Sequence, residues 1–130
     1  MTTHHGGCFC GAVRFQCTGE PLNVRICHCR NCQLSTGAPF FARALFAHDA
    51  LTITGDTARY PSSDALDRMF CPRCGTRMFS WRHTRPVVGV ALACFDDPGA
   101  FAPTEHIWVS TKIAWVQIND GLPQFPENPA

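Results

Sequence analysis

The chain has 130 residues, of which 45% are hydrophobic and 16% charged, a balance that fits one globular domain and excludes a disordered chain. The formal net charge is +1 and Lys112 is the single lysine, so the composition gives no basic field for a nucleic acid partner. The sequence has no apolar run of about 18 residues that could cross a membrane, and its first residues, MTTHHGGCFC, lack the apolar stretch of a secretory signal. We therefore expect a cytoplasmic protein with no membrane partner.

Alternation of apolar and polar residues predicts short strands along the chain. In chain order, the candidates are residues 11–17, 21–27, 50–55, 76–82, 86–95 and 106–110. A short helical turn is expected around 62–66 or 97–101, and no segment suits a helix of about 12 residues or more. The proline-rich end, 121–130, is expected to be irregular. The pattern predicts a mainly β domain with its core over about residues 5–120.

The nine cysteines carry most of the functional information. In a chain without an export signal, clustered cysteines bind metal or react more often than they form disulfides. Seven of the nine fall into three clusters, which are Cys8 and Cys10, then Cys27, Cys29 and Cys32, then Cys71 and Cys74. The other two, Cys17 and Cys94, lie in apolar segments and are expected to be small core residues.

The spacing allows two divisions of the clustered cysteines. The CxxC pair, Cys71 and Cys74, is followed by Gly75, which permits the tight turn of a zinc knuckle. If the first CxC pair joins it, a closed four-thiolate site forms and the central CxCxxC cluster is left with an open position, the pattern of a catalytic zinc. Alternatively, the knuckle could form a zinc ribbon with Cys29 and Cys32. Spacing alone leaves both divisions open.

Histidines and arginines near the central cluster are weaker candidates. His28 lies between two cysteines, and in an extended segment its side chain points the opposite way from theirs. We therefore expect it at the surface or behind the cysteines rather than as a ligand. His106 fits a packed polar residue as well as a catalytic one. Arg25, Arg30 and Arg43 lie close to this cluster along the chain, and they would be the candidates for binding if the substrate is anionic, as the resemblance described below implies.

The motifs together resemble the glutathione-dependent formaldehyde-activating enzyme (GFA) family, whose domain is shared with centromere protein V. The matching stretches are GGCFCGAVRF, CHCRNCQLSTGAPF, FCPRCGTRMF, DDPGAFAPTEHIWVS and AWVQINDGLPQF, in this order over nearly the whole chain. The resemblance implies a single domain over residues 1–130 with the Mss4-like β-tent fold, in which antiparallel sheets are pinned by zinc. It also implies two zinc ions, a structural one bound by Cys8, Cys10, Cys71 and Cys74 and a catalytic one bound by Cys27, Cys29 and Cys32.

The activity implied by the resemblance is that of a carbon–sulfur lyase. The substrate would be S-(hydroxymethyl)glutathione, in equilibrium with glutathione and formaldehyde, or a similar thiol adduct. The catalytic cysteines would act through their bound zinc, and the partner would be a small thiol such as glutathione, with a homodimer as an open alternative. The rival hypothesis is a non-catalytic zinc scaffold for a protein partner. It predicts that the open metal position is blocked, for instance by His28, and that an apolar patch is exposed.

Overall fold

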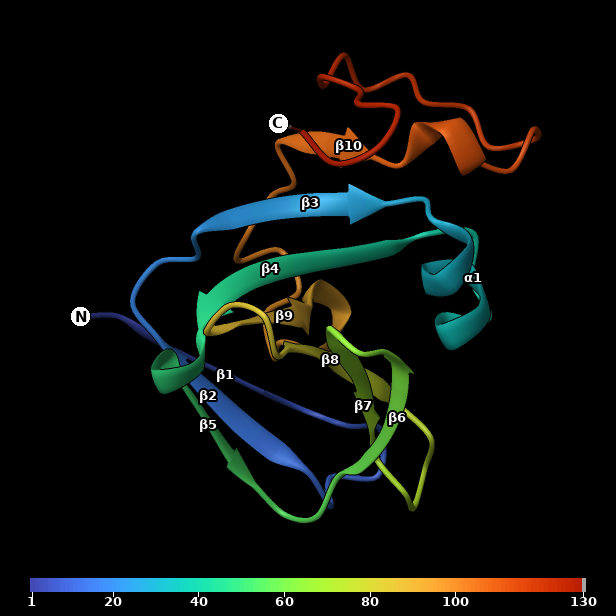
Figure 1. Ribbon diagram of the computed structural model, residues 1–130. Coiled ribbons are helices and arrows are strands. Elements are labelled where there is room, and N and C mark those ends of the chain that lie inside the picture. The colour runs from blue at the N-terminus through green and yellow to red at the C-terminus, as the bar shows by residue number, and fades with distance from the viewer. Residues whose placement is uncertain (130) are drawn as a thin grey trace.

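The computed structural model describes residues 1–129, which form two β-sheets joined by short helical segments (Figure 1). The strands are β1 (Thr3–Gly7), β2 (Arg14–Thr18), β3 (Asn23–Cys27), β4 (Phe41–Ala47), β5 (Leu51–Thr54), β6 (Ala58–Ser63), β7 (Leu66–Phe70), β8 (Arg77–Arg82), β9 (Val87–Ala91) and β10 (Glu105–Ile107). The α-helix is α1 (Arg30–Thr36), and the 3-10 turns are η1 (His48–Ala50), η2 (Leu92–Cys94) and η3 (Val109–Thr111). No helix within residues 1–129 is long and apolar enough to cross a membrane.

The two sheets differ in size and lie at an angle to each other. The smaller has the strand order β1-β2-β5, and the larger has the order β10-β3-β4-β9-β8-β7-β6. All pairings are antiparallel except that of β10 with β3, which is parallel. In Figure 1 the smaller sheet lies at the lower left, below β3 and β4, and α1 lies at the right, between the end of β3 and the start of β4. The mainly β fold expected from the sequence is confirmed.

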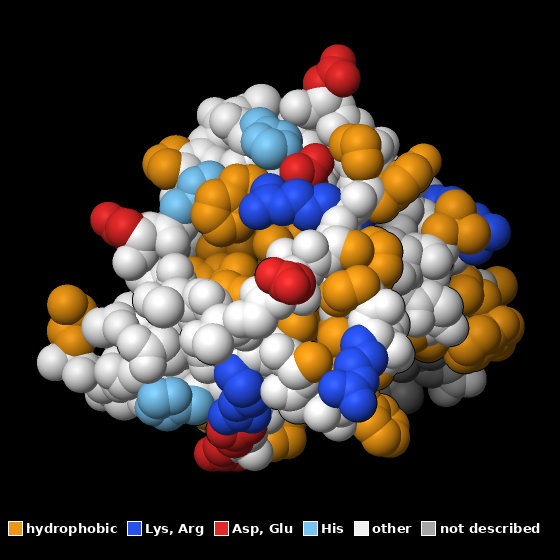
Figure 2. All heavy atoms as spheres, turned by 90° about the horizontal axis from the view of Figure 1, so that it is seen from below, with side chains coloured by type: hydrophobic (Ala, Val, Ile, Leu, Met, Phe, Trp, Pro, Cys, Tyr) orange, Lys and Arg blue, Asp and Glu red, His pale blue; other side chains and the backbone are white. Residues whose placement is uncertain are grey.

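The hydrophobic core fills the space between the sheets. Phe15 from β2 packs edge-on against Phe79 from β8 and against Phe95, with ring centroids 5.3 Å apart in each pair. Cys17 is fully buried in the same cluster, as its apolar setting predicts. Seen from below, the molecule shows hydrophobic side chains gathered in the middle of this face with charged side chains around them (Figure 2).

Several local predictions were wrong. Residues 62–66 form no helical turn, because β6 ends at Ser63 and the next strand of the hairpin begins at Leu66. Residues 97–101 form a single turn and no helix: the Ala100 amide donates to the Asp97 carbonyl at 3.1 Å, and the Gly99 amide donates to the Asp97 carboxylate. The sequence analysis also missed β1, β4, β6, β7 and α1. β4 lies between β3 and β9, inside the sheet, and its sequence FARALFA shows no clean alternation.

The C-terminal segment is irregular, as expected, but it is held in place. The His106 amide donates to the Pro123 carbonyl and the Phe125 amide donates back to the His106 carbonyl, both at 2.9 Å. Phe125 packs against the cluster of buried residues around Cys27 and Ile107. Residues 121–129 therefore form part of the wall beside β10, and residue 130 of the predicted tail lies outside the described residues.

Candidate metal centres and the adjoining cavity

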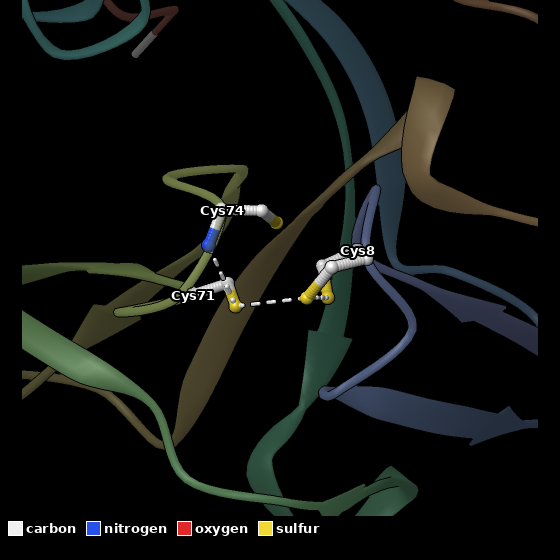
Figure 3. A group of neighbouring side chains, drawn as sticks. Cys8, Cys71 and Cys74 are labelled. Carbon is white, nitrogen blue, oxygen red and sulfur yellow. Dashed lines mark hydrogen bonds between the residues drawn. The ribbon is translucent and has the colours of Figure 1, made fainter.

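The first and third cysteine clusters meet at one end of the core. Cys8 and Cys10 follow β1, and Cys71 and Cys74 lie on the turn between β7 and β8, so the sulfurs of two distant segments point toward one another (Figure 3). The Cys8–Cys10 sulfurs are 3.7 Å apart and the Cys10–Cys71 sulfurs 3.8 Å apart. A tetrahedron with zinc–sulfur bonds of about 2.3 Å has edges of about 3.8 Å. The four thiols therefore fit one tetrahedral metal ion.

The backbone around this cluster favours thiolates. The amide of Val13 lies 3.3 Å from the Cys8 sulfur, and the amide of Arg73 lies 3.4 Å from that of Cys71. A hydrogen bond from the Thr76 hydroxyl, with nearby backbone donors, lowers the pKa of Cys74 to about 5. Gly75 has φ +79°, a left-handed conformation that glycine adopts without strain, and it closes the predicted knuckle.

The central cluster is built from a strand end and a helix start. Cys27 ends β3, Cys29 is the N-terminal cap of α1, and Cys32 lies in the first turn. The Cys29 sulfur accepts a hydrogen bond from the Cys32 amide at 3.3 Å, so the cap itself fixes the spacing of two sulfurs. Hydrogen bonds with Cys27 and then Cys32 hold the pKa of Cys29 far below its usual range, while hydrogen bonds with Cys29 and then Cys32 raise the pKa of Cys27. The cluster thus favours at least one thiolate without any metal.

The sulfurs of the chain therefore gather as four and three. The potential ligand atoms within each group lie within 4.8 Å of one another. The ribbon alternative, in which Cys29 and Cys32 would join Cys71 and Cys74, is wrong, because these pairs belong to different groups. Which group is structural and which catalytic stays a prediction.

A cavity of about 660 Å³ opens beside the three-cysteine cluster, and all three cysteines of the cluster line the cavity. Six arginines also line it, which are Arg25, Arg30, Arg43, Arg68, Arg82 and Arg85. Within residues 1–129, no aspartate or glutamate is among the lining residues. The near-zero net charge of the chain thus conceals a strongly cationic cavity.

The arginines differ in their partners. Arg25 forms an ion pair with Glu105. Arg68 is 7% exposed, and its guanidinium donates to the Cys32 sulfur at 3.5 Å. Burial, together with the nearby Arg25, lowers the pKa of Arg43 to about 10, so this residue still carries its charge at neutral pH. The sequence analysis found only the arginines close to the cysteine cluster along the chain. It missed those contributed by β7, β8 and the loop that follows, because only the fold brings them to the cavity.

His28 points away from the cavity into a buried chain of hydrogen bonds. It is fully buried, and its Nε2 lies 2.9 Å from Nδ1 of His106, whose Nε2 lies 2.7 Å from the Asp120 carboxylate. The hydrogen bond from His106 lowers the pKa of Asp120, so this carboxylate is ionised and accepts a hydrogen bond from Nε2–H of His106. Nδ1 of His106 in turn accepts a hydrogen bond from Nε2–H of His28. This leaves Nδ1 of His28 as a buried, unprotonated nitrogen without a hydrogen-bond partner in residues 1–129.

The same histidine is held by its backbone. The His28 carbonyl accepts hydrogen bonds from the Gln33 side chain at 3.0 Å and from the Thr111 hydroxyl at 3.1 Å. Burial first, and then the neighbouring His106 and Lys112, lower the pKa of His28 to about 4, so the imidazole is neutral at pH 7. Alternation along the extended segment correctly predicted that His28 turns away from the cysteine sulfurs. Asp120, the hydrogen-bond partner of His106, left no signal in the sequence.

Comparison with known proteins matches this arrangement to one family. Residues 3–111 match the family model described as glutathione-dependent formaldehyde-activating enzyme. A Halomonas elongata protein assigned by name to these enzymes is 30% identical over 124 residues, which covers 87% of this chain and 79% of the relative. An uncharacterised lyase of Schizosaccharomyces pombe is 28% identical over 79 residues, and the match covers 61% of this chain and only 58% of the yeast protein.

A solved structure supports the fold. The crystal structure of a Rhodobacter sphaeroides protein superposes with a TM-score of 0.61 and 22% identity, covering 93% of this chain and 98% of the other. The family expected from the motifs is confirmed, and with it the expectation that the protein is an enzyme. The family match extends from the first strand through η3 and includes both cysteine groups, so the chain belongs to the family of glutathione-dependent formaldehyde-activating enzymes.

Proposed function

We propose that the protein is a zinc-dependent carbon–sulfur lyase that acts on S-(hydroxymethyl)glutathione or a similar thiol–aldehyde adduct. The observation that carries this proposal is the position of the three-cysteine cluster, which lines a cavity of about 660 Å³ with six arginines. A thiol adduct with anionic groups could place its sulfur at the cysteines and its charges among the guanidinium groups. The family match and the lyase relative support the same class of reaction.

The donor sets fit two zinc ions. Cys8, Cys10, Cys71 and Cys74 would hold a structural ion, because four thiolates close a tetrahedral site. The cluster of Cys27, Cys29 and Cys32 would hold the second with one position open to the cavity. A zinc ion with an open position supplies a Lewis acid that lowers the pKa of a bound thiol.

The reaction breaks one carbon–sulfur bond. The bonding pair passes to sulfur, the hydroxyl oxygen forms the carbonyl of formaldehyde, and the hydroxyl proton is released. Within residues 1–129, no histidine or carboxylate lines the cavity, so the proton leaves to water. Arg68, which donates to the Cys32 sulfur, stabilises negative charge on the cysteine cluster. The remaining arginines orient the anionic ends of the substrate.

Magnetisation-exchange NMR on an equilibrium mixture of glutathione and formaldehyde tests the proposal. Zinc-loaded protein should accelerate exchange between glutathione and its hydroxymethyl adduct, and the Cys29→Ser variant should not. Cys94→Ser is the matched control, because this cysteine lies outside both groups. If wild-type protein with two bound zinc ions does not accelerate exchange, glutathione and formaldehyde are excluded as its substrates.

The rival hypothesis of a zinc scaffold for a protein partner keeps one supporting observation. Phe9 is 93% exposed and, with Phe40, lines a second cavity of about 590 Å³. However, His28 is directed at His106 rather than at the open metal position that the rival expects it to block. The NMR experiment separates the two, because a scaffold binds zinc without accelerating exchange.

A further inference from the structure

Most arginines that line the cavity are not paired with a carboxylate of the described residues. Arg25 is paired with Glu105, and Arg68 faces the Cys32 sulfur. Five of the six have no carboxylate within 4.0 Å in residues 1–129, namely Arg30, Arg43, Arg68, Arg82 and Arg85. Arg30 donates to the Gln33 amide oxygen and Arg43 to that of Asn23, and neither acceptor cancels a charge.

An uncompensated group of guanidinium ions favours anions and disfavours cations. Each guanidinium presents a planar fork of donors that matches a carboxylate or a phosphate. Arg43 is the clearest case, since burial and the neighbouring Arg25 already disfavour its charge and a bound anion would offset both effects. An ammonium group in the same cavity would be repelled by the arginines and would find no acidic side chain among the described lining residues.

Glutathione itself carries two carboxylates and one ammonium group. Its carboxylates suit the cavity, whereas its ammonium has no acidic partner there. We propose that the cavity selects a low-molecular-weight thiol with carboxylate or phosphate groups and no free ammonium. That the ligand is a thiol rests on the proposed function. That it carries anionic groups and no ammonium rests on the charge of the cavity.

Isothermal titration of zinc-loaded protein with matched thiols tests the inference. N-acetylglutathione, which lacks the ammonium but keeps both carboxylates, should bind at least about fivefold more tightly than glutathione. Glutathione diethyl ester, which lacks both carboxylates, should bind more weakly than either. Phosphopantetheine distinguishes the sources of anionic charge. If phosphopantetheine binds more tightly than N-acetylglutathione, the cavity prefers phosphate groups. If it binds more weakly, the cavity prefers carboxylates.

Two variants test whether the cavity arginines produce the preference for N-acetylglutathione over glutathione. Replacing Arg82 and Arg85 together by glutamine should reduce the advantage of N-acetylglutathione over glutathione to less than about twofold. Arg59→Gln, an arginine outside the cavity that pairs with Asp67, should leave the advantage unchanged. Circular dichroism would establish that both variants are folded. Equal or tighter binding of glutathione by the wild type would overturn the inference.

The outcome is separable from that of the proposed function. If the protein accelerates adduct exchange but prefers glutathione, the lyase function stands and the ligand assignment fails. If it prefers N-acetylglutathione but accelerates exchange with neither thiol, the cavity assignment stands and the lyase function fails.

Discussion

The two cysteine groups should differ in what they contribute to folding, and a pair of substitutions measures the difference. Cys71→Ser removes a thiol from the group that joins the first turn of the chain to the β7–β8 turn. Cys29→Ser removes a thiol from the group contained within one strand end and one helix start. If zinc occupies both sites, the first substitution releases a long-range cross-link, whereas the second releases a local one.

The number of residues between the joined cysteines determines how much each zinc site stabilises the fold. Cys10 and Cys71 are 61 residues apart, and a cross-link over a loop of about 60 residues restricts the unfolded chain by about 4 kcal/mol at 25 °C. The central cluster closes a loop of about five residues, for which the same relation gives about 2 kcal/mol. With an unfolding entropy of about 2.1 cal/mol/K per residue, these values lower Tm by about 15 °C and about 7 °C for a chain of this length.

Differential scanning calorimetry and zinc analysis of the purified variants provide the assay. Cys71→Ser should show the larger fall in Tm, and Cys29→Ser should lose activity while it stays folded. Cys94→Ser controls for removal of a thiol outside both groups. An equal fall in Tm for the first two variants, or a larger one for Cys29→Ser, would refute the division into a structural and a catalytic site.

Three further predictions follow from contacts around the central cluster. Arg68→Gln removes the cationic donor to the Cys32 sulfur, so zinc affinity at this site, measured by chelator competition, should fall about tenfold, whereas Arg59→Gln should not change it. Asp120→Ala removes the acceptor that fixes His106 and, through it, His28. Zinc affinity should fall by about 10- to 100-fold with little change in Tm, and an unchanged affinity would contradict a supporting role. Titration of wild-type protein with a chelator should release zinc in two steps, with activity lost in the first and the fold in the second, and simultaneous loss of both would contradict the prediction.

The cysteine groups could be predicted from the sequence because their geometry is largely local. In CxC and CxxC motifs, backbone alternation and a single tight turn place the sulfurs together, and Gly75 marks the turn. The resemblance then predicted which pair completes the four-cysteine group. Alternation also gave the direction of His28. The spacing within each cysteine motif and the direction of His28 depend on a few consecutive residues, whereas the joining of the two distant pairs was implied by the resemblance alone. All of these predictions agree with the placement seen in the structure.

The arginine-lined cavity could not be predicted in this way. Arg43, Arg68 and Arg82 lie on β4, β7 and β8, and the order of strands in the larger sheet determines that they face one space. Net charge was a poor guide because it averages over the molecule. Six of the chain's ten arginines line this one cavity, while the acidic residues lie elsewhere or are already paired. A sum of +1 is compatible with a site that strongly attracts anions.

The C-terminal segment contacts both the buried histidine chain and the arginine-lined cavity. Asp120 accepts a hydrogen bond from His106, and Asn128 is one of the residues that line the cavity. Both lie beyond residues 3–111, the part that matches the family model. The family match therefore covers the cysteines and the sheets, whereas part of the cavity wall comes from residues outside it. A substitution at Asn128 would therefore alter the cavity wall without changing a cysteine of either group.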